Sequence, residues 1–148
     1  MRRNRLALYV HFVWTTWDRL PLITPEIERR LYRNIGDSAK SLGCRILAIN
    51  GVADHVHVLL AIPSTVAIAD LVKKMKGASS RFVNDQLQPS VEFKWQGFYG
   101  AFSVSRWDLP KIINYINGQK EHHAQDTLWP ELEHAFERTD ADDRKPND

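Results

Sequence analysis

Cysteine is almost absent from the sequence, because Cys44 is the only one among 148 residues. A single cysteine cannot form a disulfide within the chain, and nothing else in the sequence requires an oxidising compartment. Long apolar runs are absent too, since none approaches the roughly 20 residues that a membrane-spanning helix needs. These two absences predict a soluble, cytoplasmic protein without a membrane anchor.

A strong net charge is the third absence, because 20 lysine and arginine residues oppose 18 aspartate and glutamate residues and leave a formal charge of +2. This balance hides an uneven distribution. Acidic residues crowd the chain from Pro130 onward, so the body before it is distinctly basic. A basic body suits a polyanionic partner, although a solvated lysine-rich surface is the more common explanation.

The length fits one ordinary domain with a real core. We predict a single domain over residues 1–137 and a disordered acidic tail over residues 138–148, which lacks large apolar residues for packing. The basic start and the apolar stretch after it mimic a signal peptide, but His11 interrupts the stretch and no small-residue cleavage site follows. We therefore interpret this segment as a first strand.

Apolar periodicity and turn residues divide the chain into alternating strands and helices. One helical face of the second helix contains Met75, Ser79 and Val83, while lysines and an arginine occupy the rest. The order predicts an α+β fold, an antiparallel sheet with helices packed on one face, of the split βαβ, ferredoxin-like kind. We expect strands at residues 6–16, 44–52, 55–62, 93–95 and 99–105, and helices at 25–42, 66–87 and about 109–125.

His55 and His57 lie two positions apart in the third predicted strand. Successive side chains of a strand point to opposite faces, so the two imidazoles share one face and Val56 and Val58 take the other. Such a pair is a natural half of a metal site, because two ligands at rigid neighbouring positions lose little entropy when an ion binds. Isolated pairs of this spacing are more often structural or incidental, so a third ligand is needed.

Tyr115 and Gln119 are one turn apart on the third predicted helix, with His122 beside them. They lie together at the edge of the apolar stripe of this helix, so we interpret Tyr115 as lying outside the core. A tyrosine that merely covers the edge of a helix is the alternative. The stripe itself consists of Leu109, Ile112, Ile113 and Ile116.

Taken together, these residues suit chemistry on a phosphodiester. His55 and His57 supply nitrogen ligands, Gln119 can add its carbonyl oxygen, and Tyr115 can supply a hydroxyl nucleophile. A tyrosine with an ordinary pKa near 10 is a poor nucleophile at neutral pH, so a divalent ion and basic residues are needed to favour the phenolate. The basic second helix offers Lys73, Lys76 and Arg81.

The segment DHVHVLL at residues 54–60 resembles the histidine-hydrophobic-histidine signature of the HUH nucleases, specifically the single-tyrosine transposases of small insertion sequences and the REP-associated tyrosine transposases. The resemblance spans roughly residues 6–125. Four further segments resemble that family in the same order, namely YVHFVW at 9–14 with Arg19, KGASSR at 76–81, YGAFSVS at 99–105 and YINGQ at 115–119.

The resemblance implies a homodimer that binds single-stranded DNA with hairpin ends and needs no nucleotide cofactor. It implies Mg²⁺ or Mn²⁺ held by His55, His57 and Gln119, and attack by Tyr115 that leaves a 5′-phosphotyrosine link and a free 3′-hydroxyl. The residues expected to contact DNA are Arg19, Lys73, Lys76, Ser79 and Arg81.

Two alternatives remain open from the sequence: a domesticated relative that binds hairpins without cutting, and an unrelated two-histidine metalloenzyme that acts on small phosphoesters. The sequence departs from the family at Trp17, where many relatives carry a basic residue, and in its acidic tail. The remaining histidines are expected to be hydrogen-bonded or at the surface. They are His11, His122, His123 and His134.

Overall fold

The computed structural model describes residues 4–125. The predicted tail at 138–148, the end of the predicted domain and His134 lie outside these residues. The strands are β1 (Tyr9–Thr15), β2 (Arg45–Val52), β3 (His55–Ala61) and β4 (Gly100–Val104). The helices are α1 (Pro25–Ser41), α2 (Ile68–Phe82), α3 (Leu109–Asn117) and α4 (Gln119–Gln125), with a 3₁₀ turn at Trp17–Arg19 and a π-helical turn at Val83–Leu87.

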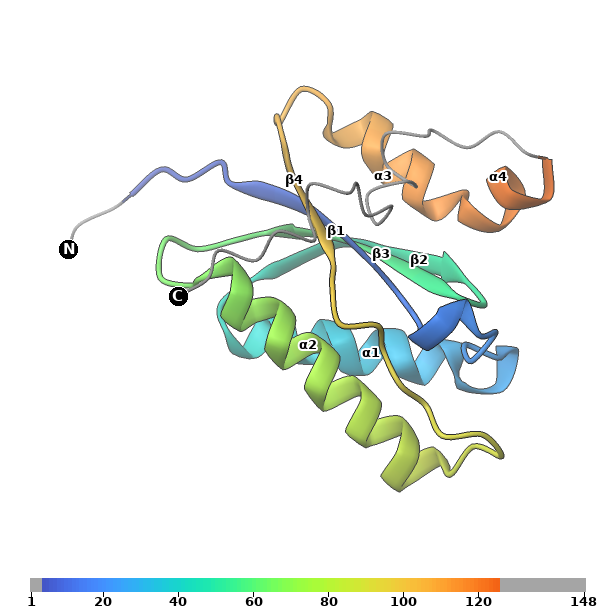
Figure 1. The fold of residues 1–148 in the computed structure, drawn as a ribbon. Coiled ribbons are helices and arrows are strands. Elements are labelled where there is room, and N and C mark those ends of the chain that lie inside the picture. The colour runs from blue at the N-terminus through green and yellow to red at the C-terminus, as the bar shows by residue number, and fades with distance from the viewer. Residues whose placement is uncertain (1–3, 126–148) are drawn as a thin grey trace, which may run out of the picture.

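The four strands form one antiparallel sheet in the order β2-β3-β1-β4. Strands β1 and β2, which α1 connects, are separated by β3, so the predicted split βαβ, ferredoxin-like architecture is confirmed. Helices α1 and α2 cover one face of the sheet, while α3 and α4 lie on the other side (Figure 1). The expectation that all helices pack on one face is therefore wrong.

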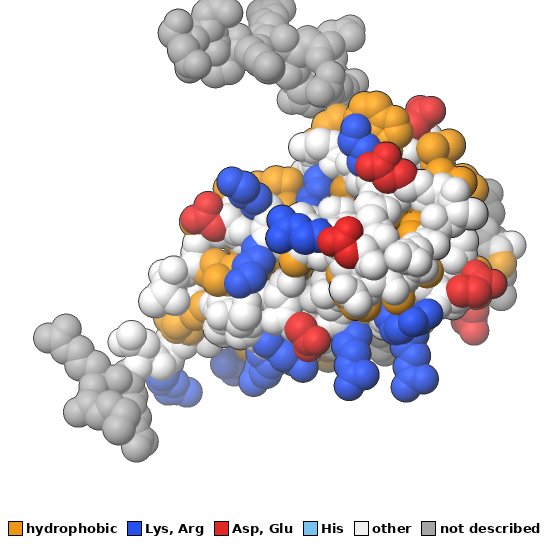
Figure 2. All heavy atoms as spheres, turned by 90° about the horizontal axis from the view of Figure 1, so that it is seen from below, with side chains coloured by type: hydrophobic (Ala, Val, Ile, Leu, Met, Phe, Trp, Pro, Cys, Tyr) orange, Lys and Arg blue, Asp and Glu red, His pale blue; other side chains and the backbone are white. Residues whose placement is uncertain are grey.

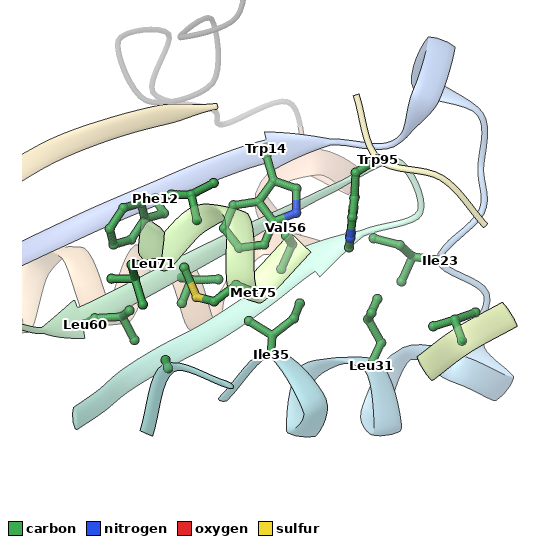
Figure 3. Close-up of a cluster of buried hydrophobic side chains, with 14 of the residues drawn as sticks. Phe12, Trp14, Ile23, Leu31, Ile35, Val56, Leu60, Leu71, Met75 and Trp95 are labelled. Atoms are coloured by element: carbon green, nitrogen blue, oxygen red, sulfur yellow. The ribbon is translucent and has the colours of Figure 1, made fainter. Parts of the chain in front are cut away.

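The main core fills the space between the sheet and the two long helices. Phe12 and Trp14 from β1 point into it and share it with Leu31 of α1 and Met75 of α2 (Figure 3). Helix α1 begins at Pro25, as expected, and ends just before Gly43, whose φ of 86° is left-handed and suits glycine. Both long predicted helices are confirmed, with ends within a few residues of the expected positions.

A smaller apolar cluster explains why α3 packs on the opposite face. Ala48 of β2 and Leu59 of β3 point to that face and contact Ile116 of α3. The remaining members of the predicted stripe of α3 pack around this contact, which confirms the stripe. Strands β2 and β3 thus carry apolar side chains on both faces, and each face needs a helix to cover it.

Two predicted elements differ from the structure. Residues 93–95 form no strand, because only an isolated bridge joins Trp95 to Thr16. The third predicted helix is divided at Gly118 into α3 and α4, in keeping with the low helix preference of glycine. Across residues 4–125, the helices are too short or too polar to cross a membrane.

Candidate active site

His55 and His57 lie on the face of β3 that points away from the main core. Their ring centroids are 5.1 Å apart, and both side chains are buried. Val56 and Val58, which alternate with them, pack into the main core. The prediction that the two histidines share one face is confirmed.

Each of these histidines uses its Nδ1 atom in an orienting hydrogen bond. His55 Nδ1 lies 2.8 Å from Asp54 Oδ1, and this bond is the largest cause that lowers the pKa of Asp54. His57 Nδ1 lies 2.9 Å from Nε2 of His11, a fully buried residue of β1. A fixed Nδ1 sets the tautomer and the ring orientation, so Nε2 is the nitrogen suited to bind a metal.

Tyr115 is brought to the histidines by α3. Its ring centroid lies 6.1 Å from that of His57, with the ring planes at 84°. The ring of His122 in α4 stacks on that of Tyr115, with the centroids 4.7 Å apart and the planes at 26°. Tyr115 is only 2% exposed, so the prediction that it lies outside the core is wrong as to burial. It does lie outside both apolar clusters, because imidazole rings cover it.

Gln119 is the first residue of α4 and is fully buried. Neither atom of its side-chain amide has a hydrogen-bond partner within residues 4–125. A buried amide without a partner costs about 1–3 kcal/mol, so this position suits a ligand that would satisfy it.

The junction of α3 and α4 is fastened to the sheet by polar contacts. Asn50 Nδ2 donates to the Asn117 carbonyl at 3.0 Å, and Lys120 Nζ donates to Asn50 Oδ1 at 3.0 Å. Lys120 also forms an ion pair with Glu28 of α1. These contacts fix the segment that carries Tyr115 and Gln119 relative to β2 and β3.

His123 also reaches the site, since its Nε2 lies 3.1 Å from Nε2 of His55. The sequence predicts hydrogen-bonded or surface roles for His11, His122 and His123, and of these it places only His122 beside Tyr115. The signal for His123 was its spacing from Tyr115 and Gln119, because each of the three residues follows the one before by four positions. On a continuous helix this spacing places the three side chains on one face. Within the described residues, no group of three or more His, Cys, Asp or Glu side chains is arranged to hold a metal ion.

The residues expected to contact DNA do not form one surface. Arg19 is exposed in the turn after β1, close enough to Asp54 for its charge to lower the pKa of that carboxyl. Lys73 and Arg81 are exposed on α2, on the helical face of the molecule, and the sheet separates them from His55. Figure 2 looks onto that helical face, where Lys and Arg side chains are interspersed with Asp and Glu.

Lys76 and Ser79 make hydrogen bonds within the protein. Lys76 donates its ammonium protons to the carbonyls of Gln96 and Phe98, and partial burial lowers the pKa of Lys76 to about 8. Ser79 is fully buried, where its hydroxyl accepts from Trp95 Nε1 at 2.9 Å and donates to the Lys76 carbonyl at 3.1 Å. A contact between Ser79 and DNA stays a prediction, and in this structure the core and these two bonds enclose the hydroxyl.

Known proteins resemble this chain in architecture and in sequence. The family model described as "Transposase IS200 like" matches residues 4–119. The ISDra2 transposase TnpA of Deinococcus radiodurans is 30% identical over 132 residues, which cover 82% of this chain and 92% of that protein.

Two solved structures are also similar. A crystal structure from Deinococcus radiodurans R1, assigned as a transposase, is 28% identical with a TM-score of 0.61, and the match covers 80% of this chain and 98% of that one. A REP-associated tyrosine transposase bound to a REP hairpin shares the fold at 15% identity and a TM-score of 0.59, over 88% of this chain and 81% of that one. Because the family match covers most of the sequence, the chain belongs to the IS200-like transposases, a family of DNA-cutting enzymes.

Proposed function

We propose that this transposase cuts and rejoins single-stranded DNA at hairpin-containing ends through a covalent link between Tyr115 and a 5′-phosphate. The observation that carries the proposal is the burial of Tyr115 against His57, beside the unpartnered amide of Gln119. A buried tyrosine surrounded by imidazoles and an amide suits a reacting group better than a packing residue.

The reaction balances without a nucleotide cofactor. The phenolic oxygen of Tyr115 forms a bond to phosphorus, the bond from phosphorus to the 3′-oxygen breaks, and the proton lost by the phenol is matched by the one gained by the 3′-oxygen. The phosphotyrosine bond conserves the free energy of the phosphodiester bond that was broken. A 3′-hydroxyl can therefore attack the phosphotyrosine in the reverse sense and rejoin the strands.

The residues present fit a divalent ion, Mg²⁺ or Mn²⁺, bound by His55, His57 and Gln119. The amide of Gln119 offers an oxygen donor, and the orienting bonds at Nδ1 leave Nε2 of His55 and of His57 as the metal donors. A bound ion would take the place of the contact between His55 Nε2 and His123 Nε2. When bound, such an ion polarises the phosphate and favours the phenolate. The mixed nitrogen and oxygen donors suit Mn²⁺ better than Mg²⁺, since Mg²⁺ prefers oxygen ligands.

We propose a homodimer as the working unit, because moving an element requires two ends to be cut and joined to each other. Hairpin recognition is supported by the fold shared with a REP-associated tyrosine transposase that binds a REP hairpin.

The experiment uses a single-stranded oligonucleotide from an end of the element at its own locus, labelled at its 3′ end, with purified protein and Mn²⁺. The fragment that carries the 5′-phosphate keeps this label, so a covalent product migrates as a labelled protein band on a denaturing gel. Tyr115→Phe should abolish the band. The matched control is Tyr9→Phe, because β1 places Tyr9 at the opposite end of the sheet from His55.

Each other outcome has a definite meaning. Wild-type protein that binds the ends but gives no covalent band contradicts the proposal and indicates a non-cutting hairpin-binding protein. Turnover of a small phosphoester that survives Tyr115→Phe, again without a covalent band, indicates the two-histidine metalloenzyme instead.

A further inference from the structure

We propose that Trp17 and Lys94 form a stacking site for one unpaired DNA base beside the histidine end of the sheet, an inference that rests on the proposed function. Trp17 is 45% exposed, although it carries the largest of the apolar side chains. Lys94 Nζ lies 4.0 Å from the centroid of its ring. An exposed indole can stack on an unpaired base, and the ammonium beside it supplies a positive charge for the neighbouring phosphate.

The turn that carries Trp17 is fixed by its backbone. Asp18 and Arg19 have φ values of 52° and 49°, in a left-handed conformation that residues other than glycine mostly avoid. The Trp17 N–H donates to the Lys94 carbonyl at 2.9 Å, and the Asp18 N–H donates to Gln96 Oε1 at 3.2 Å. The ring and its lysine are therefore held together before any ligand arrives, which lowers the entropy cost of binding.

The same turn is fastened to the active site. The backbone N–H of Thr16 donates to the Asp54 carbonyl at 2.9 Å, and its hydroxyl lies 3.2 Å from the same oxygen. Asp54 holds His55 through its carboxylate. Thr16 thus connects the turn of Trp17 to Asp54, the residue that orients a proposed metal ligand, and the proposal places a strand bound at His55 within reach of Trp17.

The chemistry favours an unpaired base over other occupants. The bases of a duplex have both faces covered by their neighbours, whereas an unpaired base can leave its strand and stack on an exposed indole. Arg19 adds a second exposed cation on this side of the site. Stacking is tolerant of base identity, so the site would select single-stranded DNA over duplex without reading its sequence.

The test measures binding on the Tyr115→Phe background, where no covalent link can form. A fluorescent strand from the element's end, carrying 2-aminopurine at successive positions around the cut, is titrated with protein. Trp17→Ala should weaken binding about 5-fold to 150-fold and should relieve the stacking-induced quenching of 2-aminopurine at one position. Trp17→Phe should recover most of the affinity, and a duplex of the same sequence should show no difference.

Trp107 provides the matched control. It is 79% exposed and has Arg106 positioned 4.6 Å over its ring, but it follows β4 at the end where Val104 pairs with Tyr9, away from His55. Trp107→Ala should leave single-strand binding within about twofold of the parent, well below the effect of losing a stacked base.

Three results would overturn the inference. The first is equal effects of Trp17→Ala and Trp107→Ala, and the second is 2-aminopurine quenching that stays unchanged in Trp17→Ala. The third is a change from dimer to monomer in Trp17→Ala by light scattering, which would assign the ring to a protein contact. The failure of the proposed function is distinguishable, because it shows as a missing covalent band in the wild type, whereas this binding assay requires no cleavage.

Discussion

The bond between His11 and His57 makes a sharp prediction about metal affinity. His11 is fully buried, stacks on His57 at 5.1 Å between ring centroids and lies 2.9 Å from its Nδ1. His11→Phe keeps a ring of similar size in this place but removes the hydrogen bond. Loss of such an orienting partner typically lowers metal affinity about 10-fold to 100-fold, or about 1.4–2.7 kcal/mol.

The assay is titration of the purified protein with Mn²⁺, following the electron paramagnetic resonance signal of the free ion. The control is Phe102→Leu, which alters the packing around His11 at 6.2 Å between ring centroids but leaves the bond to His57 in place. We expect this control to bind Mn²⁺ like the wild type. If His11→Phe binds Mn²⁺ as tightly as the wild type and shows only a lower unfolding midpoint, the orienting role is refuted. His11 would then be a purely structural residue.

Two further variants test neighbouring parts of the account. Gln119→Leu removes the proposed oxygen ligand and a buried amide without a partner. Mn²⁺ affinity should fall, while the metal-free protein should become about 1–3 kcal/mol more stable to urea. A less stable protein that binds Mn²⁺ as tightly as the wild type would contradict the assignment. Burial lowers the pKa of Lys76 from 10.5 to about 8, so this side chain binds fewer protons in the folded protein than in the unfolded protein. The free energy of unfolding should therefore rise between pH 8 and 10.5. Lys76→Met should lose this rise relative to the wild type in urea titrations across that range, and an identical pH profile would show that the burial penalty is absent.

Much of the fold follows from local patterns in the sequence. Proline at the start of α1 and glycine after its end mark that helix, and strand alternation puts His55 and His57 on one face. The pairing of β1 with β3 is a long-range property that no local pattern contains. The contact between His11 and His57 depends on that pairing, so the sequence left His11 without a specific role.

The burial of Tyr115 could not be predicted from its own helix. A helical wheel ranks positions by the apolar residues on that helix, whereas Tyr115 is covered by polar rings from β3 and α4. Ser79 shows the opposite case, since the wheel placed it on the apolar face of α2 with Met75. The structure agrees with the wheel, because Ser79 is buried there.

The most direct test of the central claim is mass spectrometry of the protease-digested covalent product. The peptide that contains Tyr115 should carry the 5′-phosphate of the downstream fragment on the phenolic oxygen of Tyr115. A link on any other residue, or cleavage of the strand with no linked peptide, would contradict it.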